Sequence, residues 1–96
     1  MISTVKLAKA ARKALRKSPE HIVVKLLGWV DLVENEGLAK ARMIPGYHDE
    51  PLRGRRRGQR SIRLSHAWRA VYAIEEPVDQ SEGSFVLVTE VSKHDY

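Results

Sequence analysis

The stretch that decides the fold is Ser61-Ile62-Arg63-Leu64-Ser65-His66-Ala67-Trp68-Arg69-Ala70-Val71-Tyr72-Ala73-Ile74. Its first part, Ser61 to Ser65, alternates polar and apolar side chains, as a half-buried strand does. His66-Ala67 is expected to turn the chain. Trp68 to Ile74 is rich in aromatic and β-branched residues and predicts a second strand.

A third strand is predicted from Ser84 to Ser92, after a polar loop from Glu76 to Gly83. Its side chains are apolar on both faces, which is typical of a strand in the middle of a sheet. The apolar residues that carry this interpretation are Phe85, Val86, Leu87, Val88 and Val91.

Upstream of the strands the hydrophobic period is helical. Apolar residues at three- and four-residue steps predict a first helix from Val5 to Lys17. Ser18-Pro19 has the signature of an N-cap followed by the first helical position. A strongly amphipathic second helix is predicted to end near Glu36, with Gly37 as its C-cap. Its stripe comprises Ile22, Leu26, Val30 and Val33, flanked by Val23, Leu27 and Trp29. Residues 38–44 predict a short helical turn, stopped by Pro45-Gly46.

Helices first and strands afterwards indicate an α+β domain. We expect two N-terminal helices packed on one face of a small antiparallel sheet, with all 96 residues in a single domain.

The composition excludes several classes of chemistry. The chain has no cysteine, so disulfides and thiolate metal sites are impossible. Its four histidines show no metal-ligand spacing, and no phosphate-binding loop or nucleophile elbow is present. We therefore expect neither a metal nor a cofactor. No apolar run approaches the ~18 residues of a membrane span, and no signal peptide is recognisable, which predicts a cytoplasmic protein without a membrane partner.

Positive charge is concentrated in two segments. Residues 1–19 carry six basic side chains and no acidic one, and residues 53–69 carry seven arginines and no acidic one. The rest of the chain holds all 12 acidic residues. For the first segment, a solvated helix face kept for solubility remains the alternative to a binding role. The second uses arginine throughout, and the planar guanidinium grips phosphate with two hydrogen bonds.

The predicted sheet would present part of this charge on one surface. If Ile62, Leu64 and Trp68 face the helices, Arg63 and Arg69 share the open face. The glycine-punctuated segment 53–60 would enter that face from the edge. A basic platform about three strands wide would suit a nucleic-acid backbone.

General acid–base chemistry is the reaction type that remains. In RNA cleavage the 2′-hydroxyl is the nucleophile, so a protein needs only a proton acceptor, a proton donor and cations for the phosphate. His94, Asp95 and Tyr96 follow the last strand, and His94 is the candidate acid or base. His21 and His66 are expected to be exposed. His48 lies in a loop, and the sequence leaves open whether it is simply exposed or takes part in function.

Four segments in the C-terminal half resemble the RelE/HigB toxin superfamily. They are Glu50-Pro51-Leu52-Arg53-Gly54, Arg57-Gly58-Gln59-Arg60-Ser61-Ile62-Arg63-Leu64, Trp68-Arg69-Ala70-Val71-Tyr72, and Val88 to Tyr96 with its Lys93-His94 ending. The resemblance implies the toxin of a type II toxin–antitoxin system. Such toxins are ribosome-dependent, metal-independent endonucleases that cleave mRNA in the ribosomal A site and so inhibit translation.

The same resemblance implies roles for particular residues. Arg69 would contact the scissile phosphate, Arg63 would support it, and His94 would be the catalytic acid or base. The residues implied in RNA binding are Arg53, Arg55, Arg56, Arg57, Arg60, Lys93 and Tyr96.

Two other functions stay open. A ParE-like toxin would bind and poison DNA gyrase without cleaving anything, because a shared fold does not settle the activity. A non-catalytic RNA-binding module would need the arginines but no titrating group. The toxin interpretation implies the ribosome and mRNA as partners. It also implies a cognate antitoxin that covers the basic face in a heteromeric complex, by wrapping the helices or adding along the sheet edge.

Overall fold

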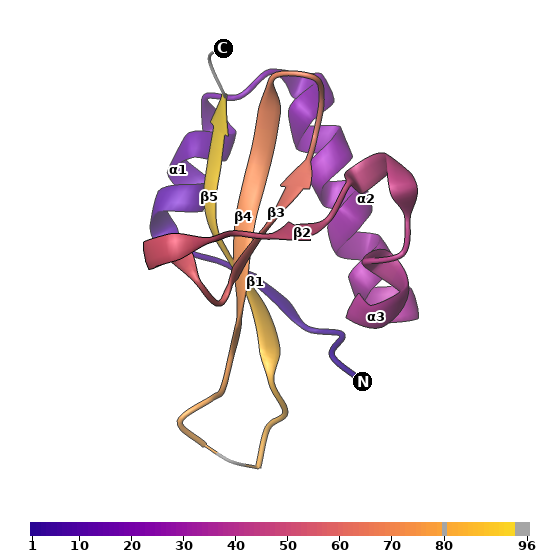
Figure 1. Cartoon of the computed structure of the whole chain (residues 1–96), viewed down its shortest axis with the longest axis vertical. Helices are drawn as coiled ribbons and strands as arrows, with labels where there is room; N and C mark the ends of the chain where they lie inside the picture. The colour runs from indigo at the N-terminus through magenta and orange to yellow at the C-terminus, as the bar shows by residue number, and fades with distance from the viewer. Residues whose placement is uncertain (80, 94–96) are drawn as a thin grey trace.

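The computed structural model describes residues 1–79 and 81–93. Strands and helices follow one another as Figure 1 shows. In chain order they are β1 (Val5–Leu7), α1 (Lys9–Arg16), α2 (Glu20–Glu36), α3 (Leu38–Ala41), the 3-10 turn η1 (Pro45–Tyr47), β2 (Glu50–Pro51), the 3-10 turn η2 (Gly54–Arg56), β3 (Gln59–Arg63), β4 (Trp68–Glu75) and β5 (Phe85–Lys93).

The strands form one five-stranded sheet in the order β1-β5-β4-β3-β2. Neighbouring strands from β2 to β5 are antiparallel, whereas β1 runs parallel to β5. The predicted antiparallel arrangement is therefore correct for the three predicted strands, β3, β4 and β5. β2, which was not predicted, adds antiparallel to β3, and the parallel β1 makes the sheet mixed. β5 lies between β1 and β4, so its predicted central place is confirmed.

The predicted start of the first helix at Val5 is also wrong. Val5 and Leu7 are half-buried around the exposed Lys6, which is the alternation of a strand. Pairing with β5 gives this segment its backbone partners, and the amide of Ala8 continues the pairing by donating to the Val88 carbonyl at 2.9 Å. Three residues are too few for a pattern that sequence reasoning can detect, and tertiary pairing decides their conformation.

The second helix agrees with its prediction except at its start. Pro19 is the N-cap, and no side chain caps the helix there. The predicted cap, Ser18, instead donates its hydroxyl to the Ala14 carbonyl of α1 at 2.9 Å. Gly37 ends the helix with φ +88°, a conformation that glycine adopts without strain.

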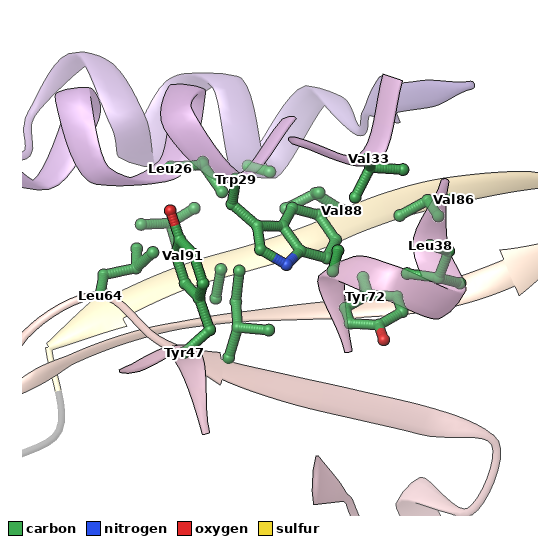
Figure 2. Close-up of a cluster of buried hydrophobic side chains, with 14 of the residues drawn as sticks. Leu26, Trp29, Val33, Leu38, Tyr47, Leu64, Tyr72, Val86, Val88 and Val91 are labelled. Carbon is green, nitrogen blue, oxygen red and sulfur yellow. The ribbon is translucent and has the colours of Figure 1, made fainter. Parts of the chain in front are cut away.

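The core lies between α2 and the helix-facing side of the sheet, as Figure 2 shows. Ile22, Leu26, Trp29 and Val33 of α2 are fully buried, whereas Val30 of the predicted stripe is only partly buried. The Trp29 and Tyr72 rings lie 5.1 Å apart, so the tryptophan joins α2 to β4. Ala11 of α1 belongs to the same cluster, which confirms that both helices pack on one face.

Among the described residues, no helix combines the length and the apolar character that crossing a bilayer requires.

Candidate phosphate-binding site

Two arginines face each other across the β3–β4 ladder. Arg63 and Arg69 are cross-strand partners, and the next pair along, Ile62 and Ala70, is buried on the helix side. Because side chains alternate along a strand, both guanidinium groups extend from the face that the helices leave uncovered. Like charges directly opposite each other repel, so this pair costs stability unless an anion lies between them.

A cavity of about 190 Å³ opens beside these arginines. It lies at the end of the sheet where β3 turns into β4. Its polar lining comprises His48, Glu50, Ser61, Arg63, Ser65, His66 and Arg69. His66 is exposed in the turn, as expected.

One donor in this cavity is buried without a partner. Among the described residues, none accepts a hydrogen bond from Nε of Arg69, which has no access to solvent. Leaving a buried donor unsatisfied costs about 1–3 kcal/mol, and more for a charged group. A phosphate oxygen could accept from it with a charge-assisted bond only after the Arg69 side chain shifts to bring Nε to the cavity surface.

His48 and Glu50 supply titrating groups on the other wall. Nε2 of His48 lies 3.4 Å from Oε2 of Glu50, and both side chains are more than half exposed. His48 has φ +46°, which is uncommon for a residue other than glycine and is found at functional sites. Sequence reasoning left the role of His48 open and did not select Glu50. The only signal was that two titrating residues flank Asp49 just before the arginine segment.

Asp49, between them, ties this segment to the sheet. Its side chain is fully buried, with Oδ1 2.6 Å from Nε of Arg60 and Oδ2 2.6 Å from the Tyr72 hydroxyl. Burial and the bond to Asp49 raise the pKa of Tyr72 well above its usual value. Burial alone would lower the pKa of Arg60, but the hydrogen bond and charge of Asp49 outweigh it and raise that pKa.

Arg60 therefore does not lie with the other arginines. It pairs with Tyr72 across the ladder, so its side chain is on the helix-facing side, where Asp49 holds it. Its charge is already matched, which leaves it little capacity for the predicted RNA contact.

The arginine segment 53–57 lies across the uncovered face instead of extending from its edge. Arg56 forms an ion pair with Glu90 of β5 through Nη2, and its Nε donates to Oε1 of Gln59 at 3.1 Å. Arg56 must cross β4 to reach β5, and Val71 beneath is fully buried. The predicted three-strand platform is thus narrower than expected, because the segment covers its centre (Figure 1). Arg53, Arg55 and Arg57 remain exposed.

Of the predicted site residues at the C-terminal end, only Lys93 belongs to the described part of the chain. Lys93 is exposed at the end of β5, opposite Trp68, and Ser92 pairs with Arg69. His94 and Tyr96 lie outside the described residues. Within the described part of the chain, no group of histidine and acidic side chains could hold a metal ion.

The fold of this chain is similar to that of several solved toxin structures. The YoeB/ParE toxin from Agrobacterium tumefaciens superposes with a TM-score of 0.71 at 16% identity, covering 96% of this chain and 99% of that chain. A chain of the toxin–antitoxin complex RelBE2 from Mycobacterium tuberculosis gives 0.68 at 23% identity, covering 98% and 100%. A chain of the archaeal RelE-RelB complex from Pyrococcus horikoshii gives 0.68 at 21%, covering 97% and 96%. No protein-family model and no curated protein matches the chain.

Proposed function

We propose that this chain is the toxin of a type II toxin–antitoxin system and a ribosome-dependent, metal-independent endonuclease that cleaves mRNA in the ribosomal A site. The observation that carries the proposal is the cross-strand pair of Arg63 and Arg69, which lines one cavity together with His48 and Glu50. This arrangement offers two cations for a phosphate and a titrating pair beside it.

The reaction needs no nucleophile from the protein. The 2′-oxygen attacks the adjacent phosphorus, the bond from phosphorus to the 5′-oxygen breaks, and a 2′,3′-cyclic phosphate and a 5′-hydroxyl result. Arg69 and Arg63 stabilise the charge that develops on the phosphate oxygens. His48, with Glu50 beside it, accepts the 2′-hydroxyl proton. His94 remains the proposed donor to the departing 5′-oxygen.

The exposed arginines supply affinity. Arg53, Arg55 and Arg57 are free to contact RNA phosphates, and Lys93 extends the positive charge at the end of β5. We retain Tyr96 as a proposed RNA contact. Arg56 and Arg60 are held by Glu90 and Asp49, so we assign them to shaping the site.

We propose a cognate antitoxin as the partner that keeps this basic cavity covered in the cell, and hence a heteromeric complex in the cytoplasm. Structures similar to this chain include complexes named RelE-RelB, YoeB-YefM and DinJ-YafQ. An exposed basic cavity is suited to an acidic segment, because complementary charge accelerates association.

The experiment that tests the proposal is primer extension on an mRNA translated in vitro, with and without ribosomes. We expect cleavage only with ribosomes. Absence of cleavage, together with inhibition of gyrase in a supercoiling assay, would instead favour the ParE-like alternative.

A further inference from the structure

We propose that Asp49 is a positioning residue, whose buried carboxylate holds His48 and Glu50 at the cavity wall in the orientation that cleavage requires. The inference rests on the proposed function and extends it to a residue that touches neither substrate nor the reacting atoms.

The segment that carries His48 and Glu50 has little backbone support. β2 consists of Glu50 and Pro51 alone, paired with Ser61 and Arg60 of β3. Pro51 has no amide hydrogen to donate. Two residues of strand at the edge of a sheet are therefore weak restraints on the side chains beside them.

The side chain of Asp49 supplies the missing restraint. Its two oxygens accept from Arg60 on β3 and from Tyr72 on β4, both at 2.6 Å. A single carboxylate thus fastens the segment to two strands that also carry Arg63 and Arg69. The titrating pair and the arginine pair are in this way built on one rigid frame.

The backbone of His48 shows that such a restraint is needed. Its φ of +46° persists in a non-glycine residue only where the surroundings over-determine it. On one side its amide donates to the Pro45 carbonyl at 3.0 Å. On the other side, Asp49 is the next residue in the chain.

Stability alone is a poor explanation for the Asp49–Arg60 pair. The Asp49 carboxylate is fully buried, whereas the Arg60 side chain is 22% exposed. Burying a charge incurs a desolvation cost that attraction to a partner seldom exceeds, and apolar side chains of similar volume often serve as well. The pair instead gives the segment one defined position. Precise placement of reacting groups is worth up to about a hundredfold in rate for a displacement of 1 Å.

The test compares Tyr72→Phe and Asp49→Asn with a control, Thr89→Val. Thr89 donates to the Val71 carbonyl at 3.3 Å and lies near the bulge of the same ladder, so its variant also loses one side-chain hydrogen bond. Two quantities are measured for each protein. They are hydrogen exchange across residues 47–52, and the single-turnover cleavage rate at saturating toxin on programmed ribosomes.

We expect exchange in residues 47–52 to accelerate in Tyr72→Phe and in Asp49→Asn, and not in Thr89→Val. The saturating cleavage rate should fall about ten- to a hundredfold in the first two, while the toxin concentration for half-saturation changes less than about twofold. A purely structural role would lower only the active fraction and leave the rate constant unchanged. Tyr72→Phe keeps the Asp49–Arg60 pair, so it remains informative if Asp49→Asn does not fold.

A wild-type rate in a folded Tyr72→Phe, with or without faster exchange, would overturn the positioning role. Absence of cleavage by the wild type would overturn the proposed function itself. In that case hydrogen exchange across residues 47–52 would by itself test whether Asp49 anchors the segment. Faster exchange in Tyr72→Phe would support the anchoring role, and unchanged exchange would overturn it.

Discussion

Arg69 shows most directly how a single residue links the fold to its function. Its backbone belongs to a regular strand, yet its Nε is buried without an acceptor among the described residues. Such a group lowers stability in the free protein, and in the proposed function a bound phosphate would supply its hydrogen bond. The unsatisfied donor therefore lowers the stability of the free protein at a residue that we propose for phosphate binding.

Arg69→Met tests this conflict between stability and phosphate binding. Methionine keeps an unbranched side chain while removing the orphaned donor and the charge opposite Arg63. We expect the free energy of unfolding to stay level or to rise by about 1 kcal/mol, while ribosome-dependent cleavage is lost. Denaturant unfolding and primer extension on the same preparation check both. A large loss of stability would show that Arg69 is structural.

The two tryptophans should differ in their contribution to stability. The sequence placed Trp68 facing the helices and Trp29 only at the flank of the α2 stripe, but Trp68 is partly buried and Trp29 is fully buried. We expect Trp29→Ala to lower the free energy of unfolding by about 3–5 kcal/mol, and Trp68→Ala to lower it by less. Parallel chemical denaturation of the two variants measures the difference. The reverse order would contradict the assignment of Trp29 to the centre of the core.

Tyr72 should make stability depend on alkaline pH. Burial and Asp49 raise its pKa in the folded protein above that of an exposed tyrosine. Its contribution is therefore complete below the unfolded value of about 10 and is lost as pH rises towards the folded value. The wild type should lose stability above that pH more steeply than Tyr72→Phe. Unfolding curves between pH 8 and pH 11 provide the measurement, and parallel slopes would argue against the Asp49 contact.

At the scale of elements, the sequence predicted the long helix, the long strands and the short helical turn that became α3, and it missed the two shortest strands. α2, β4 and β5 each carry enough residues for a period of 3.6 or 2 to be recognised. β1 and β2 have three residues and two residues, and each exists because a neighbouring strand pairs with it. The same limit, that a short segment carries no recognisable period, applies to the site residues. Arg63 and Arg69 lie on strands with a readable alternation, whereas His48 and Glu50 lie on a segment placed by long-range contacts.

The arginine segment illustrates a second limit. Composition indicated five arginines of one kind, Arg53, Arg55, Arg56, Arg57 and Arg60. Tertiary contacts separate them, because Glu90 and Asp49 each engage one. Neither partner is close in sequence to the arginine it holds, so no local pattern reveals the pairing.

Salt dependence should separate these arginines. Arg55 is exposed, whereas Arg56 is already paired with Glu90. If Arg55 contacts a phosphate, Arg55→Ala should reduce the slope of log affinity against log salt by about one, because one contact fewer releases counterions. Arg56→Ala should change that slope less. Affinity for programmed ribosomes over a range of salt concentrations measures both slopes. Equal changes in the two variants would contradict the distinction between the exposed Arg55 and the paired Arg56.

At the scale of the whole molecule, the two ends differ in charge. The β4–β5 hairpin extends to one end of a body about 41 Å long, and the far end of β5 lies at the other (Figure 1). Its tip carries Glu75, Glu76, Asp79 and Glu82, whereas Arg69 lies near the other end of β4, opposite Arg63 of β3. At physiological salt, charge is screened over about 8 Å, so each end acts separately. The hairpin tip therefore faces away from any RNA held by Arg63 and Arg69.

The measurement that tests the central claim most directly is the single-turnover cleavage of mRNA in programmed ribosomes by the wild type, Arg69→Ala and Arg16→Ala. Arg16 is an exposed arginine of α1 and does not line the cavity, so its variant controls for loss of one positive charge. We predict that Arg69→Ala loses at least about a hundredfold in rate, in the range found when a preorganised charge-stabilising donor is removed, and that Arg16→Ala stays near the wild type. Equal rates for Arg69→Ala and the wild type would contradict the assignment of this cavity as the cleavage site.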